Sequence, residues 1–159
     1  MIRKKILLIG DFNVGKTSLI RRYVDNTFDD KYLTTIGVKI SKKRLIVNDE
    51  EYELLIWDIE GATPQKPIPK TYYSGASGAV FVGDISRADT IEHIQNHVQT
   101  FIDINRKSSF VVAYNKADLL SSEQIEGLVL EKNTFLTSAK EDKNVEEMFL
   151  ALAMEMEND

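Results

Sequence analysis

Cysteine is absent from this 159-residue chain, which excludes a disulfide framework and any thiol for catalysis or lipid attachment. Apolar runs of the length that a membrane-spanning helix requires are also missing. The basic stretch 3–5 is followed by only four apolar residues, 6–9, too few for a secretory signal. Ile2 excludes the N-terminal glycine that myristoylation needs. We therefore expect a cytoplasmic protein with no lipid anchor in this sequence, which would reach a membrane only through partners or a removed tail.

Basic charge is not in excess either. Twenty Lys and Arg residues face 25 Asp and Glu residues, giving a formal net charge of -5 and a pI near 5.1. A nucleic-acid-binding protein usually carries a basic face, so we predict no nucleic-acid partner. With 43% hydrophobic and 28% charged residues, the chain has an ordinary globular composition, and its length suits one domain spanning 1–159. We expect a monomer.

Proline is scarce and confined to one place. All three prolines, Pro64, Pro67 and Pro69, lie within six residues of one another. Proline has no backbone N–H and clashes with the preceding helical turn. This stretch is therefore predicted not to form a regular helix.

Strand-like and helix-like segments alternate along the rest of the chain. Continuous apolar runs predict buried strands, and apolar residues spaced three and four apart predict helices. The predicted strands are 6–9, 44–47, 52–57, 78–85, 110–114 and 134–137, of which the second and third form a hairpin around 48–50. The predicted helices are 16–24, 89–102 with a capping box at Asp89 and Glu92, 121–132, and a last one capped by Asn144 that buries Val145, Met148, Phe149, Leu152 and Met156. This alternation predicts an α/β protein with a mostly parallel sheet of about six strands, one antiparallel edge strand and helices on both faces.

Residues 10–17, GDFNVGKT, match the pattern G-x-x-x-x-G-K-[ST] between a predicted strand and a predicted helix. Glycines allow the backbone N–H groups to wrap around phosphate oxygens, and the helix N-terminus adds a positive dipole. Lys16 supplies a charge for the outer phosphates, and Thr17 supplies a hydroxyl for Mg²⁺. The pattern predicts a P-loop NTPase-type three-layer fold, and a turn with a surface lysine is the less favoured reading.

Four further segments follow this loop in a fixed order. Thr35-Ile36-Gly37, Trp57-Asp58 with Gly61, Asn115-Lys116-Ala117-Asp118, and Ser138-Ala139-Lys140 all fall at or near the ends of predicted strands. With Tyr72 to Ala76, they make nearly the whole chain resemble the Ras superfamily of small GTPases, most closely the Rab branch. The resemblance implies GTP or GDP and Mg²⁺ as ligands, and effector and regulatory proteins that bind through the switch regions 30–40 and 58–75.

The resemblance also implies a role for each matching residue. The implied catalytic residues are Lys16, Thr35 and Gly61, and the implied Mg²⁺ ligands are Thr17, Thr35 and Asp58, the last through water. The implied nucleotide-binding residues are Asn13, Val14, Gly15, Lys16, Thr17, Ser18, Phe28, Thr35, Gly61, Asn115, Lys116, Asp118, Ser138, Ala139 and Lys140. Asp118 would accept two hydrogen bonds from guanine, a donor pair that adenine does not offer. Asn115 would tie the base-binding loop to the phosphate loop, whereas Phe28 could equally be a core residue.

The chain departs from the family at several positions. Ala62 stands where the family usually has the glutamine that orients the attacking water. Glu60 and Phe12 replace small residues near the phosphates, and the three prolines give a divergent switch II. The stretch between Asp118 and Ser138 is short for the family, which puts the length of its helix in doubt.

These departures lead to the prediction of a guanine-nucleotide switch that hydrolyses GTP slowly. The alternative is a non-hydrolysing pseudo-GTPase that acts as an interaction module. An ATP-using P-loop enzyme is disfavoured by the N-K-x-D and S-A-K segments, and a scaffold without nucleotide is disfavoured by the retained Lys16, Thr17, Asp58 and Asp118.

Overall fold

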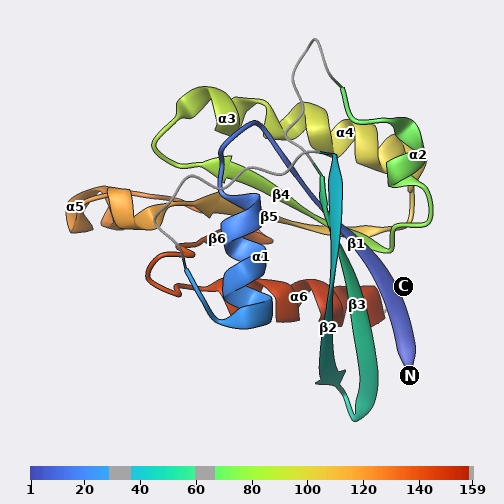
Figure 1. Ribbon diagram of the computed structural model, residues 1–159. Helices are drawn as coiled ribbons and strands as arrows, with labels where there is room; N and C mark the ends of the chain where they lie inside the picture. The colour runs from blue at the N-terminus through green and yellow to red at the C-terminus, as the bar shows by residue number, and fades with distance from the viewer. Residues whose placement is uncertain (29–36, 60–66, 158–159) are drawn as a thin grey trace.

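A computed structural model describes residues 1–28, 37–59 and 67–157 (Figure 1). The strands are β1 (Ile2–Gly10), β2 (Val38–Val47), β3 (Glu50–Ile59), β4 (Gly78–Asp84), β5 (Ser109–Asn115) and β6 (Thr134–Leu136). The helices are α1 (Lys16–Asp25), α2 (Lys70–Tyr73), α3 (Ala88–Glu92), α4 (Ile94–Ile104), α5 (Ser122–Glu126) and α6 (Val145–Glu157), with a 3-10 turn at Ala117–Leu119. Among these residues, no helix combines the length and the apolar character needed to cross a membrane.

The six strands form one sheet in the order β2-β3-β1-β4-β5-β6. Only the β2–β3 pair is antiparallel, and every other neighbouring pair is parallel. The hairpin turns at Asn48 and Asp49, which both have positive φ, at 50° and 67°. Such a turn matches the twist of the two strands that it joins. The predicted fold class and the antiparallel edge strand are confirmed.

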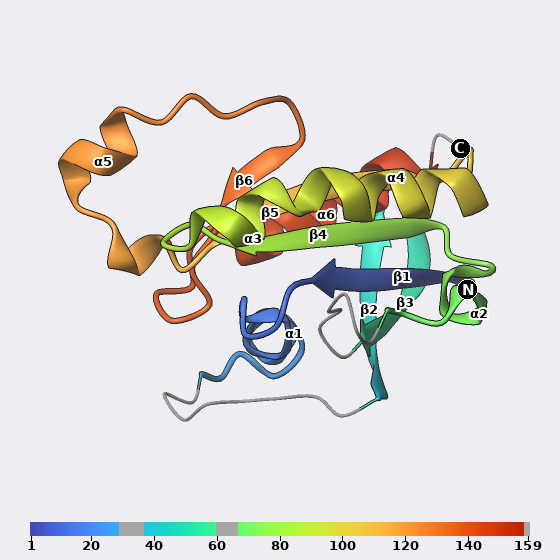
Figure 2. The ribbon, with the colours of Figure 1, turned by 90° about the horizontal axis from the view of Figure 1, so that it is seen from above.

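The sheet lies between two layers of helices (Figures 1 and 2). Successive residues of a strand point to opposite faces. Thus Ile6 and Leu8 join the core with α1 and α6, whereas Leu7 and Ile9 join the core with α4. This explains why the strand is apolar at every position, since each side chain meets a helix layer.

The predicted face of α6 is confirmed, because all five of its expected residues are buried. The predicted helix over 89–102 is wrong in its start and its continuity. It begins at Ala88 after Arg87, where no side-chain cap is formed among the described residues, and it divides at His93 into α3 and α4. The Thr90 hydroxyl instead hydrogen-bonds the backbone of Asp84, which holds this turn against the end of β4.

The helix predicted over 121–132 begins as expected but ends early. Ser121 and Gln124 form a reciprocal capping box, and α5 ends at Glu126 before Gly127. None of its residues is buried, so packing does not extend it. Figure 2 shows α5 projecting beyond the β6 edge of the sheet. Near the prolines, residues 67–69 are not helical, as expected, whereas Pro64 lies outside the described residues. The short helix α2, which starts directly after Pro69, was not predicted.

Candidate functional site

The sequence motifs meet at the carboxyl ends of the parallel strands. The phosphate loop, residues 10–17, follows β1, and Asp58 lies near the end of β3. Asn115 is the last residue of β5, and Ser138 follows β6. In open α/β sheets, ligands bind at this edge because the loops there converge. The fold therefore gathers residues from four separate segments into one place.

The phosphate loop is shaped by close approaches that exclude larger side chains. A Cβ at Gly10 would lie 2.3 Å from the carbonyl oxygen of Val82, and one at Gly15 would lie 2.4 Å from Nδ2 of Asn115. Gly15 also has φ at 99°, a conformation that favours glycine. It stands at the N-cap of α1, whose first turn contains no acidic residue, and no side chain of the described residues caps it. The N–H groups of this turn thus provide donors for an anion.

Thr17 and Asp58 are brought together from α1 and β3. The Thr17 hydroxyl donates a hydrogen bond to Oδ2 of Asp58 at 2.6 Å. Asp58 is only 2% exposed, and Lys16 beside it is also buried, with its Nζ 3.4 Å from the carbonyl oxygen of Gly10. A hydroxyl and a carboxylate at this separation are oxygen ligands of the kind that Mg²⁺ prefers.

Buried hydrogen bonds join the loop after β5 to both of its neighbours. Nδ2 of Asn115 donates to the carbonyl oxygen of Val14 at 3.0 Å, and Oδ1 of Asn115 accepts from the Thr137 hydroxyl at 3.0 Å. The backbone N–H of Ala117 donates to the Thr137 carbonyl at 3.0 Å. The expected link between the phosphate loop and the loop after β5 is therefore present, and a second link reaches the loop after β6.

The segment Ser138-Ala139-Lys140 is held from two sides. The Ser138 hydroxyl donates to Oδ1 of Asp118 at 2.7 Å. Arg22, on α1, donates through Nε to the Ala139 carbonyl at 2.8 Å and through Nη2 to the Lys140 carbonyl at 3.1 Å. Sequence reasoning missed Arg22, because its role depends on a contact across more than 100 residues. Ser138 and Ala139 are buried, whereas Lys140 is exposed.

Lys116 and Asp84 hold the outer edge of the phosphate loop. Nζ of Lys116 donates to the carbonyl oxygen of Asn13 at 2.9 Å and lies 3.1 Å from Oδ2 of Asp84. Burial by itself raises the pKa of Asp84, but hydrogen bonds from the Ser86 hydroxyl and amide and from Lys116 outweigh it, so this pKa lies below its usual value. Asp84 was not predicted, although a carboxylate at the end of the apolar strand 78–84 was a signal for it.

The remaining predicted site residues lie in the core, in the phosphate loop and α1, or outside the described residues. Phe28 is partly buried and packs against the core beside α1, so the core-packing alternative is present. Val14 is buried and Ser18 is half-buried within the phosphate loop and α1. Thr35 and Gly61, with Glu60 and Ala62, lie outside the described residues.

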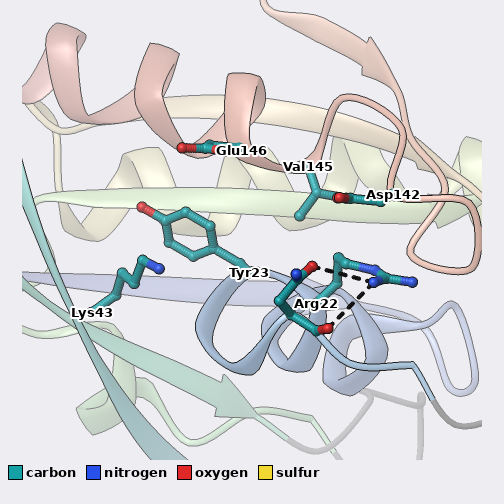
Figure 3. Close-up of a pocket in the computed structure, with 7 residues that line it drawn as sticks. Arg22, Tyr23, Lys43, Asp142, Val145 and Glu146 are labelled. Carbon is teal, nitrogen blue, oxygen red and sulfur yellow. Dashed lines mark hydrogen bonds between the residues drawn. The ribbon is translucent and has the colours of Figure 1, made fainter.

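A cavity of about 210 Å³ lies near the C-terminal end of α1, between β2 and the start of α6 (Figure 3). Its walls include Arg22, Tyr23, Lys43 and Glu146, and none of the predicted nucleotide residues lines it. Nζ of Lys43 lies 5.0 Å from the centre of the Tyr23 ring. Because opposite charges face each other across this cavity, it provides no clear basis for binding one kind of ion.

The residues present fit a nucleoside phosphate with Mg²⁺. Glycine at 10 and 15 leaves room where any Cβ would clash, and the N-cap of α1 is a glycine with no side-chain cap among the described residues. Lys16 supplies positive charge, while the paired Thr17 and Asp58 supply oxygen ligands for the metal. Asp118 and Ser138 are hydrogen-bonded to each other on the loops that follow β5 and β6, and Thr137, next to Ser138, bonds to Asn115.

Comparison with known proteins agrees with this geometry. Residues 5–158 match the family model described as "Ras family". The chain is 34% identical to the Ras-related protein Rab-1C of Dictyostelium discoideum, over 96% of this chain and 80% of that protein. It is 35% identical to the Ras-related protein SEC4 of Saccharomyces cerevisiae, over 94% of this chain and 73% of that protein. It is also 35% identical to the Ras-related protein Rab-13 of Rattus norvegicus, over 96% of this chain and 79% of that protein. The chain therefore belongs to the Ras family, as a Rab-like small GTPase of the class that acts as GTP-binding molecular switches.

Proposed function

We propose that this protein is a guanine-nucleotide switch that binds GTP and GDP with Mg²⁺ and hydrolyses GTP slowly. The convergence of the phosphate loop, Asp58, Asn115 and Ser138 at one edge of the sheet supports the binding function. The proposal of slow GTP hydrolysis rests mainly on Ala62. Alanine at the position after Gly61 has no side-chain group that can orient the attacking water.

The assignment of guanine rests on Asp118. Its carboxylate is oriented by the Ser138 hydroxyl at 2.7 Å, on a loop that Asn115 and Thr137 fix to the rest of the site. A carboxylate held in this way suits a base edge with two adjacent N–H donors, which guanine has and adenine lacks. Ala139 would donate its backbone N–H to the guanine carbonyl, and the stem of Lys116 would lie against the base.

The metal and the phosphates would be held at the other end of the site. Lys16 would contact the outer phosphates, and Thr17, Thr35 and Asp58 would provide the Mg²⁺ site, with Asp58 acting through water. Gly61 would donate its backbone N–H to the γ-phosphate. Contacts from Thr35 and Gly61 to that phosphate exist only with GTP, so partners that bind at 30–40 and 58–75 could distinguish the two states.

Phe12 supports the proposal that catalysis is slow. Its side chain is 50% exposed at the rim of the phosphate loop, and its carbonyl oxygen accepts a hydrogen bond from Nη2 of Arg87 at 2.8 Å. A bulky ring here would obstruct an arginine supplied by an activating protein. Glu60 adds negative charge close to Gly61 in the sequence. Three changes thus oppose the stabilisation of charge and the orientation of water.

Single-turnover hydrolysis of bound GTP tests the proposal. Nucleotide extracted over time from the Mg²⁺-loaded protein should remain GTP for longer than nucleotide extracted from Rab-13 that is assayed in parallel. Ala62→Gln alone should recover little activity, whereas combining it with Glu60→Ala and Phe12→Gly should recover more. A rate equal to that of the relative would contradict slow hydrolysis, while complete absence of turnover with tight GTP binding would favour the pseudo-GTPase alternative.

A further inference from the structure

The chain contains two histidines, and both approach the same carboxylate in the phosphate loop. Nδ1 of His93 is hydrogen-bonded to Oδ2 of Asp11, and Nε2 of His97 lies 3.0 Å from Oδ1 of Asp11. More than 80 residues separate Asp11 from either histidine along the chain. The proposed nucleotide site uses none of these three side chains.

The helix geometry places the two rings on one side of α4. The backbone N–H of His97 donates to the His93 carbonyl at 3.2 Å, so the residues are one helical turn apart. A second carboxylate, from Asp89 on α3, completes the group. Ligand atoms of Asp11, Asp89 and His93 all lie within 4.8 Å of one another.

This set of donors has the chemistry of a transition-metal site. Neutral imidazole nitrogen and carboxylate oxygen are ligands of Zn²⁺, with metal–ligand distances of about 2.0–2.2 Å. Two ligands of one tetrahedral ion at such distances lie roughly 3.3–3.5 Å apart. The ligand atoms of Asp11, Asp89 and His93 lie within 4.8 Å of one another, so a small movement of these side chains brings them to this separation.

The exposure of the group permits access while keeping the ligands in position. The side chains of Asp11 and His97 are 17% and 16% exposed, whereas that of His93 is 51% exposed. One side of the group is therefore packed and the other faces solvent. The nearest basic side chain in sequence, Arg87, is directed to Asp84 and to the Phe12 carbonyl.

We propose that Asp11, Asp89 and His93 bind a divalent transition-metal ion, with Zn²⁺ as the preferred ion, separate from the Mg²⁺ at Thr17 and Asp58. His97 supports the site by holding the other oxygen of the Asp11 carboxylate. The ion links the start of the phosphate loop to the α3–α4 segment. Because the loop must loosen for a bound phosphate group to leave, the ion slows nucleotide release. This inference goes beyond the proposed function and does not depend on the rate of hydrolysis.

Direct metal titration of the full chain tests the site. The protein is loaded with GDP and saturating Mg²⁺, and Zn²⁺ is added in a calorimeter at about pH 8. We expect one Zn²⁺ per chain. His93→Gln and His97→Gln should each weaken Zn²⁺ binding by at least about 10- to 100-fold. This is the loss seen when a residue that hydrogen-bonds a metal ligand is removed from a metal site.

Glu92→Gln is the matched control, because it removes a neighbouring exposed acid that is outside the ligand set. Its Zn²⁺ affinity should equal that of the wild type. Titration with Co²⁺ gives an independent readout, since tetrahedral ligation by protein groups produces visible absorption much stronger than the weak bands of hydrated Co²⁺. Circular dichroism of each variant separates loss of a ligand from loss of the fold.

Release of a fluorescent GDP analogue then measures the effect on the phosphate loop. Zn²⁺ should slow release from the wild type and from Glu92→Gln, but not from the variant that lacks both histidines. The proposal is overturned if that double variant binds Zn²⁺ as tightly as the wild type. If Zn²⁺ binds but the rate of nucleotide release does not change, the metal site is supported and its proposed effect on nucleotide release is contradicted. Failure of the analogue to bind at all would instead contradict the proposed function, while the metal titration would still report on the site.

Discussion

The loops at the two ends of the candidate site are held together by different kinds of contact. Around the loops after β5 and β6, which we propose bind the base, the groups are buried and largely neutral: Asn115 accepts from the Thr137 hydroxyl and donates to the Val14 carbonyl. Along the outer edge of the phosphate loop, residues 11–13 are contacted by the ionisable side chains of His93, His97, Arg87 and Lys116.

This difference explains how one end of the site can be rigid while contacts at the other end change with pH, salt and bound ions. Buried neutral hydrogen bonds are costly to break, because each group left unpaired loses its solvation. Contacts made by partly exposed charges contribute less and depend on pH, salt and bound ions. We therefore expect substitutions in the proposed base-binding loops to have larger effects than substitutions at the outer edge of the phosphate loop.

The largest effect is expected for Asp118→Ala. Two charge-assisted hydrogen bonds to guanine would be lost, which corresponds to about 3–6 kcal/mol, or about 10²- to 10⁴-fold in the GTP dissociation constant. Binding of ATP should change much less, so the preference for guanine should decrease. Nucleotide competition measures both constants, with Asp103→Ala on the exposed face of α4 as the control. Unchanged GTP affinity would show that Asp118 does not contact the base.

Asn115→Ala should be the most destabilising single change to the protein itself. It leaves the Val14 carbonyl and the Thr137 hydroxyl without their buried partner, a loss of about 2–4 kcal/mol in the free energy of unfolding. Urea denaturation with nucleotide removed avoids a contribution from ligand binding. Asn96→Ala, at an exposed position of α4, should change stability by less than about 0.5 kcal/mol. Equal effects of the two substitutions would contradict the comparison.

Asp84→Asn should have an intermediate effect that depends on pH. The folded state lowers the pKa of Asp84, so its contribution to stability is present above its unfolded pKa, near about 3.9, and is lost as pH falls through the folded value. At neutral pH the variant should be less stable by about 1–2 kcal/mol, because Lys116 and Ser86 lose their charged partner. This deficit should shrink in urea denaturations repeated below about pH 4. A deficit independent of pH would mean that the charge of Asp84 is unimportant.

Arg87→Ala should have the smallest effect of the four. It removes a hydrogen bond to the Phe12 carbonyl and a 3.7 Å contact with Asp84 from a side chain that is 36% exposed. We expect a loss below about 1 kcal/mol, reduced further by salt. Urea denaturation at low and high ionic strength, beside Arg106→Ala as an exposed control, measures it. A loss as large as that of Asn115→Ala would remove the distinction between the two ends of the site.

Much of the architecture was predictable because it depends on local patterns. The uninterrupted apolar run 6–9 indicated a strand covered on both faces, and the spacing of Val145, Met148 and Phe149 indicated the buried face of α6. Local patterns failed where a distant contact or its absence decided the outcome. The helix expected to start at Asp89 begins one residue earlier, where Thr90 bonds to the end of β4, and α5 ends early, with none of its residues buried.

The sequence by itself determined the order of the strands and helices, the glycine-rich loop with Lys16 and Thr17, and the motifs that place the chain in its family. Their chemistry follows from residue type and spacing, which need no coordinates. Only the tertiary structure decided that Arg22 holds the Ala139 loop and that His93 and His97 meet Asp11. These contacts join residues more than 80 positions apart, so they depend on which helix faces which strand end, and no local pattern records that.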